Sequence, residues 1–101
     1  MIMRVWHGWT SPENADGYQN LLESEVLPGI HRIDGYRGAW ILRQAKDDEV
    51  AFIVITTWES WEAIAEFAGQ GHTGAVITDK AHLLLKRFDE HSDHYDAKWI
   101  A

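Results

Sequence analysis

The chain has 101 residues, 46% of them hydrophobic and 25% charged, and its formal net charge is −7 without a basic cluster. This composition is typical of a folded globular domain, and we expect one domain over residues 1–101. The charge argues against nucleic acid and anionic membrane surfaces, both of which attract faces rich in Lys and Arg. The lack of cysteine excludes disulfides, thiol nucleophiles and Cys-ligated zinc.

The amino terminus, MIMRVWHGW, has no long apolar run followed by a small-residue cleavage site. No segment reaches the roughly 20 apolar residues that a membrane-spanning helix needs. We therefore predict a cytoplasmic protein without a membrane partner.

The chain begins with a predicted strand and helix. Ile2–Trp9 is predicted as a strand, with His7 on one face and Trp6 and Arg4 on the other. Ser11-Pro12-Glu13 is a helix-start signal. One apolar stripe at helical spacing follows, made of Tyr18, Leu21, Leu22 and Val26. We expect Pro28-Gly29 to stop or bend this helix.

A hairpin is predicted next, with strands at Tyr36–Ala45 and Val50–Trp58 around a charged turn. Both faces of the second strand are apolar: Phe52, Val54 and Trp58 share one face with Thr56, and Ala51, Ile53 and Ile55 share the other. A hairpin usually leaves one polar face in water. The chain's own helices can cover one face, and we expect a second subunit to cover the other. The predicted assembly is a homodimer.

The second half predicts a short helix and a last strand. Ser60 is expected to cap a helix over Trp61–Ala68, ended by Gly69-Gln70-Gly71. Its inner side is predicted to contain Trp61, Ile64, Ala65 and Ala68. Two further helical pieces are predicted at 73–77 and 79–84. A final strand is predicted over 86–101, interrupted near Asp89-Glu90. The order β-α-β-β-α-β indicates an α+β, ferredoxin-like fold with a four-stranded antiparallel sheet.

The segments IDGYRGAWILRQ, VAFIVITTWESWEAIAEFAG and DEHSDHYD resemble the antibiotic biosynthesis monooxygenase family. The resemblance covers nearly the whole chain and is most specific at Gly35-Tyr36-x-Gly38-Ala39 and Thr57-Trp58-Glu59-Ser60. It implies a dimeric α+β barrel in which two sheets pair and a pocket lies between each sheet and its own helices. The two motifs are signatures of the fold, and the fold alone does not determine the reaction.

Members of this family differ in chemistry. Some oxygenate anthrone or quinol substrates with dioxygen and neither metal nor flavin, and others bind and degrade haem. The haem-degrading branch uses an Asn on the first strand and a Trp and a His ten residues apart. Here Trp6 and His7 lie where that Asn would be, and Phe67 and Ile77 occupy the other two positions. None of the three positions therefore has the residue of the haem triad, and His72 is the nearest alternative iron ligand.

A cofactor-free oxygenase needs a base, a dry pocket and donors for an oxyanion. His7 and His72 are the candidate bases, although the pattern favours a packed sheet residue at His7 and a solvated loop residue at His72. The candidate substrate contacts are Trp6, Trp40, Trp58, Trp61, Phe67 and His94, and core packing explains the aromatic ones equally well. We predict no metal site, because strand alternation divides the polar cluster at 89–96 between two faces. Arg4, Arg37 and Arg43 lie on strands, and any one of them is able to hold a carboxylate or enolate.

The prediction is thus a small monooxygenase that uses dioxygen on a small aromatic substrate without a cofactor. A haem-binding or haem-degrading protein, and a small-molecule-binding domain of the same fold, remain the alternatives.

Overall fold

The computed structural model describes all 101 residues. The strands are β1 (Ile2–Thr10), β2 (Tyr36–Lys46), β3 (Glu49–Trp58), β4 (Leu85–Phe88) and β5 (Asp93–Asp96). The helices are α1 (Ala15–Leu21), α2 (Leu27–Ile30), α3 (Trp61–Ala68) and α4 (Asp79–Leu84), with a 3₁₀ turn η1 (Pro12–Asn14) before α1 and a π-helical turn η2 (Leu22–Val26) between α1 and α2. None of these helices has the length and apolar character needed to cross a bilayer.

The strands form one antiparallel sheet in the order β2-β3-β1-β4, and β5 pairs with the other half of β1. This order confirms the ferredoxin-like prediction. The sheet has five strands instead of four because the last strand is divided, as the sequence indicated near Asp89-Glu90. The division coincides with Trp6, whose indole Nε1 donates to the Asp89 carbonyl at 2.8 Å and so replaces strand pairing at that point.

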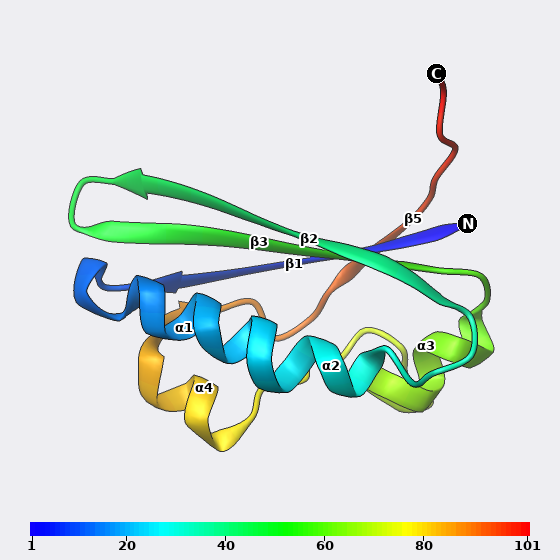
Figure 1. Cartoon of the computed structure of the whole chain (residues 1–101), viewed down its shortest axis with the longest axis horizontal. Helices are drawn as coiled ribbons and strands as arrows, with labels where there is room; N and C mark the ends of the chain where they lie inside the picture. Colours follow the sequence, from blue (N-terminus) through cyan, green and yellow to red (C-terminus); the bar gives the residue numbers. More distant parts are fainter.

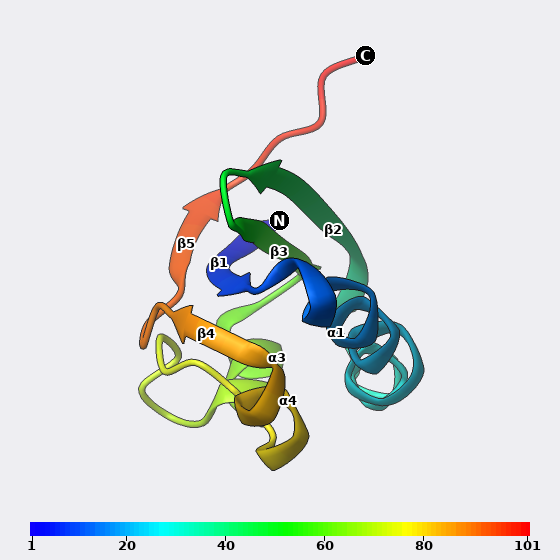
Figure 2. The same ribbon diagram turned by 90° about the vertical axis from the view of Figure 1, so that its left-hand side faces the viewer.

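All the helices cover one face of the sheet (Figure 1). Seen from the end, the sheet curves so that β4 lies down beside the helices, while β5 stays at the level of β1 and β3 (Figure 2). The covered face holds the core, in which Phe52 and Trp58 of β3 are fully buried. Tyr18 of α1 meets the Phe52 ring edge-on at 4.9 Å between centroids. The predicted division of β3 into two faces is therefore confirmed.

The opposite face of the sheet carries no helix (Figure 1). The strand register brings together an apolar group made of Met3, Val5, Trp40, Leu42, Ile53 and Ile55, which we call the open face. Trp40 is 57% exposed and Leu42 is 42% exposed. The tail at residues 97–101 extends away on this side and ends with exposed Trp99 and Ile100 (Figures 1 and 2).

The first helix ends at Ile30, one residue beyond Pro28-Gly29, where the sequence predicts a stop or a bend. Proline lacks an N–H and its ring crowds the carbonyl of the preceding turn. Here the turn before it widens: the Leu27 N–H donates to the carbonyl of Leu22, five residues back. The π turn gives the proline room, and the helix continues beyond it.

Two further predictions about the second half need correction. Residues 73–77 are extended instead of helical, because Gly74 pairs in a bridge with His91. Ser60 caps α3 as predicted, with its Oγ accepting from the Ala63 N–H at 3.2 Å. However, the buried side of α3 is formed by Ala63 and Ile64, and Trp61 lies partly exposed on another side.

Candidate functional site

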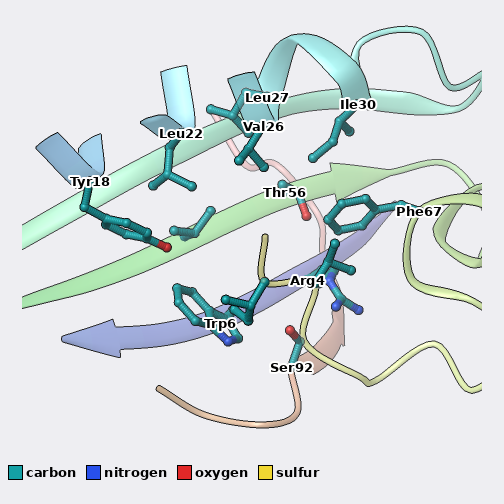
Figure 3. A pocket seen from close by; sticks show the side chains of 13 residues that line it. Arg4, Trp6, Tyr18, Leu22, Val26, Leu27, Ile30, Thr56, Phe67 and Ser92 are labelled. Atoms are coloured by element: carbon teal, nitrogen blue, oxygen red, sulfur yellow. The ribbon is translucent and has the colours of Figure 1, made fainter. Parts of the chain in front are cut away.

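A mostly apolar cavity lies between the covered face of the sheet and the helices (Figure 3). Its volume is about 50 Å³, which is room for on the order of three or four water molecules. Its walls come from β1, β3, the first helix, α3 and the extended segment after α3. The lining residues are Arg4, Trp6, Tyr18, Leu22, Val26, Leu27, Ile30, Val54, Thr56, Phe67, Val76, Ile77 and Ser92.

Arg4 provides the only charged side chain of this lining. It is 4% exposed and projects from β1 toward the helices. Its guanidinium donates to the backbone carbonyls of His72 and Gly74, the latter at 2.8 Å, and lies 3.1 Å from Nε2 of His94. It also lies over the Phe67 ring, 5.4 Å from the centroid. These contacts fix the cation at one end of the cavity.

No carboxylate pairs with Arg4, although the chain is acidic overall. Other arginines have acidic partners: Arg37 pairs with Glu59, Arg43 with Asp16 and Arg87 with Glu49. Burial lowers the pKa of Arg4 to about 10, so the side chain remains charged at neutral pH. A buried cation without a counter-charge costs several kcal/mol. An anion in the cavity would therefore form the ion pair with Arg4 that no carboxylate of the protein forms.

The neighbouring histidine does not supply that counter-charge. Guanidinium groups only donate, so Nε2 of His94 accepts from Arg4 and is unprotonated. Burial, together with the positive charges of Arg4 and His72, lowers the pKa of His94. His94 is thus a neutral imidazole that holds Arg4 in place.

Three hydroxyl groups also line the cavity, on Tyr18, Thr56 and Ser92. Burial raises the pKa of the Tyr18 phenol well above its usual value, so the group stays neutral. Thr56 lies directly opposite Arg4 in the β1–β3 register, and its Oγ1 accepts from the Trp58 indole at 2.8 Å. Ser92 Oγ is buried without a hydrogen-bond partner. Figure 3 shows Thr56 and Ser92 near the Arg4 end and Tyr18 at the other end.

The predicted substrate contacts are only partly brought together. Trp6 and Phe67 line the cavity. Trp58 lies behind the wall and orients Thr56. Trp40 belongs to the open face and lies away from the cavity. Trp61 contacts the rings of two histidines edge-on, at 5.5 Å from His72 and 5.1 Å from His94, outside the lining.

Neither predicted base reaches the cavity. His7 lies on the opposite side of the sheet, where its Nδ1 is 3.3 Å from an Asp89 carboxylate oxygen. The reason is strand alternation, because Trp6 next to it takes the covered side. His72 has a left-handed backbone at φ 66°, and it faces Trp61 with its ring while its carbonyl binds Arg4. This geometry argues against either imidazole as a base within the cavity.

The sequence reading missed Tyr18, Thr56 and Ser92, and it did not distinguish Arg4 from Arg37 and Arg43. Alternation along the first strand did place Arg4 on the face of Trp6, which was the available signal. Nothing in the sequence indicates that Arg4 lacks an acidic partner or that Ser92 is buried, because both depend on segments distant in the chain. No group of three or more His, Asp or Glu side chains is positioned to hold a metal ion.

No protein-family model and no curated protein sequence matches the chain. Solved structures do match it along its whole length. A candidate antibiotic biosynthesis monooxygenase from Deinococcus radiodurans superimposes with a TM-score of 0.71 at 14% identity, covering 100% of this chain and 96% of that one.

Two further matches were solved with ligands. The monooxygenase from the gene ActVA-Orf6 of Streptomyces coelicolor, in complex with nanaomycin D, has a TM-score of 0.63 at 16% identity, covering 99% of this chain and 89% of that one. The heme degrader MhuD of Mycobacterium tuberculosis, with two hemes in its active site, has a TM-score of 0.61 at 18% identity, covering 100% and 99%. At these identities the likeness concerns the fold. The chain therefore has the fold of the antibiotic biosynthesis monooxygenases, as the sequence resemblance implied.

Proposed function

We propose that the protein is a cofactor-independent monooxygenase that oxidises a small aromatic or quinol-like substrate with dioxygen. The observation that carries this proposal is the buried Arg4 cation, which lines an apolar cavity and has no acidic partner. The likeness to a monooxygenase in complex with nanaomycin D supports the reaction type.

The chemistry follows from the charge of Arg4. A phenol, enol or activated CH₂ group that loses a proton becomes an anion able to transfer an electron to dioxygen. The radical pair then joins through a C–O bond, and the resulting hydroperoxide loses water. For a CH₂ group the balance is CH₂ + O₂ → C=O + H₂O. A fixed cation stabilises the anion that starts this sequence, and its effect is large because the apolar wall keeps water out.

The same arrangement defines where the proton goes. The cavity lining contains no imidazole and no carboxylate. We propose that Arg4 lowers the substrate's own pKa enough for the proton to leave to bulk water while the wall is open, so that the closed cavity holds the anion. Trp6 and Phe67 then contact the flat faces of the ring.

The wall must move to admit a substrate, because ligand pockets typically measure about 300–1,000 Å³ and this cavity has about 50 Å³. The stretch 76–78 forms part of the wall through Val76 and Ile77, belongs to no helix or strand, and lies beyond the His72 and Gly74 carbonyls that hold Arg4. We propose that displacement of this stretch opens the cavity.

We also propose that two copies pair across the open face, since Trp40 and Leu42 are left in water on a single chain. This pairing would give the dimeric barrel that the family resemblance implies. A cytoplasmic location remains a prediction.

Haem binding is the second candidate, favoured by the likeness to MhuD. The residues present do not fit a haem, because Phe67 and Ile77 offer no metal ligand and no imidazole lines the cavity. This disagreement places haem second.

The test is oxygen uptake with a panel of hydroquinones and anthrones in the presence of a metal chelator. Arg4→Gln should reduce uptake at least about a hundredfold, the usual effect of removing an oxyanion donor. Arg37→Gln is the matched control, because Arg37 is exposed and paired with Glu59. Equal activity of Arg4→Gln and the parent protein would refute the role of Arg4. A Soret shift with haemin and no uptake across the panel would replace this proposal with haem binding.

A further inference from the structure

We propose that Arg4, Thr56 and Ser92 form a binding site for one oxyanion of a small aromatic acid, either a carboxylate or a phenolate. The inference names the substrate class of the function proposed above and rests on it only for the ligand's later oxidation. Binding itself depends on the donors that the three residues direct into the cavity.

Ser92 provides the first argument, because its hydroxyl is buried without a partner. The residue is 3% exposed and its Oγ makes no hydrogen bond, although it lines the cavity. Its backbone N–H is tied to the Thr73 carbonyl at 2.6 Å, close to the Gly74 carbonyl that Arg4 holds. Buried polar groups in proteins are nearly always paired. The Ser92 hydroxyl is therefore available to an acceptor that enters the cavity.

Thr56 provides a second unused donor. Its Oγ1 accepts the Trp58 indole N–H, so the hydroxyl's orientation is constrained and its own hydrogen has no partner. The register places Thr56 opposite Arg4 on the neighbouring strand. Figure 3 shows its oxygen directed toward the Arg4 end of the cavity.

Arg4 supplies the charge and the remaining donors. Three of its five N–H groups bind the carbonyls of His72 and Gly74 and the ring of His94, which leaves two without a partner in the protein. No carboxylate of the chain competes for them. A ligand oxyanion at this point would complete three unfilled requirements: the cation, the Ser92 donor and the Thr56 donor.

The rest of the cavity determines the body of the ligand. Apolar side chains form ten of its thirteen lining positions. Trp6 and Phe67 lie on two sides of Arg4, and the neutral Tyr18 phenol lies at the other end of the cavity (Figure 3). A single aromatic ring bearing one oxyanion matches this division between one charged end and an apolar remainder.

Isothermal titration with benzoate and with its neutral isostere benzamide tests the proposal. Benzoate should bind at least about tenfold more tightly, because a hydrogen bond to a charged group is worth about 1.5–3 kcal/mol. A parallel titration uses 4-nitrophenol, whose phenolate absorbs visible light and so reports the ionisation of the bound phenol. Tighter binding of benzoate identifies a carboxylate as the preferred anion, and tighter binding of the phenolate identifies a phenol.

Ser92→Ala is the decisive variant. It should weaken binding of the preferred anion about tenfold without lowering the melting temperature of the free protein, because the hydroxyl has no partner to lose. Ser24→Ala, which removes an exposed serine hydroxyl that donates to the Asn20 carbonyl, is the matched control and should leave anion binding unchanged. Arg4→Lys retains the positive charge and Arg4→Gln removes it, while both variants lose the guanidinium contacts that hold the fold. Anion binding that is weaker in Arg4→Gln than in Arg4→Lys therefore reports the charge and not a loss of folding.

Equal affinities for benzoate and benzamide, with no phenolate binding, would overturn the proposal. So would a Ser92→Ala variant that binds the anion as tightly as the parent. If the anions bind as expected and no substrate of the panel consumes oxygen, this proposal stands and the proposed oxygenase function fails.

Discussion

Pairing across the open face is tested most directly by Leu42→Asp. Leu42 lies on β2 beside Ile53 of β3, within the apolar surface that no helix covers. In a twofold dimer the same surface is used by both copies, so one substitution changes the interface twice. The aspartate would have to lose its water against apolar neighbours when the copies pair.

The size of the effect follows from exposure. Leu42 retains 42% of its accessible surface on the single chain. Because complete burial of a leucine is worth about 1.5–3 kcal/mol, covering this fraction contributes roughly 0.6–1.3 kcal/mol per subunit. Loss of both leucines alone weakens pairing roughly ten- to seventyfold. Desolvation of two unpaired carboxylates adds further cost, so the expected loss exceeds about a hundredfold.

Sedimentation velocity over a micromolar concentration range measures the effect. The parent should sediment as a pair, and Leu42→Asp as a single 11.6 kDa particle. Leu83→Asp is the matched control, since Leu83 of α4 is 82% exposed on the helical side and should leave pairing unchanged. A folded parent that stays single, or a Leu42→Asp protein that pairs normally, would refute the reasoning.

Three further predictions concern β1 and its neighbours. Thr10→Val should leave the thermal midpoint unchanged or raise it, because Thr10 Oγ1 is buried without a partner; a clear fall would show that this hydroxyl makes a stabilising hydrogen bond. The pKa of His94 is lower in the folded protein than in the unfolded chain, so as pH falls the unfolded chain binds the proton first. The contribution of neutral His94 to folding stability is therefore complete above the unfolded pKa of about 6.5 and is lost as pH falls below it. Denaturant titrations should therefore show stability falling below about pH 6.5, with a shallower dependence in His94→Gln, and parallel slopes would contradict this assignment. His7→Ala should leave oxygen uptake within about twofold, because His7 lies across the sheet from the cavity; a loss in the 10²–10⁴-fold range of general-base catalysis would restore His7 as the base.

Much of the fold was predictable from local pattern. Strand side chains alternate with a period of two, so the division of β3 between the Phe52 face and the Ile53 face follows from sequence alone. The Ser60 cap is likewise local, because the serine and the N–H that it accepts are three residues apart. The continuation of the first helix past Pro28 was not predictable in this way, since a single widened turn removes the expected conflict.

The site depended on information that no local pattern contains. Alternation showed that Arg4 and Trp6 share one face and His7 takes the other, but not which face the helices would cover. That choice rests on the packing of α1 and α3 against the sheet, and it places Arg4 in the cavity and His7 outside.

The sequence by itself determined which side chains share a strand face, because backbone geometry imposes that order wherever a strand forms. Only the tertiary structure decided that Arg37 and Arg43 have acidic partners while Arg4 has none, and that Ser92 lies buried beside the same cavity. Charge pairing and burial are properties of residues distant in the chain, here 88 positions apart for Arg4 and Ser92. They arise only when the divided last strand returns to pair with the first.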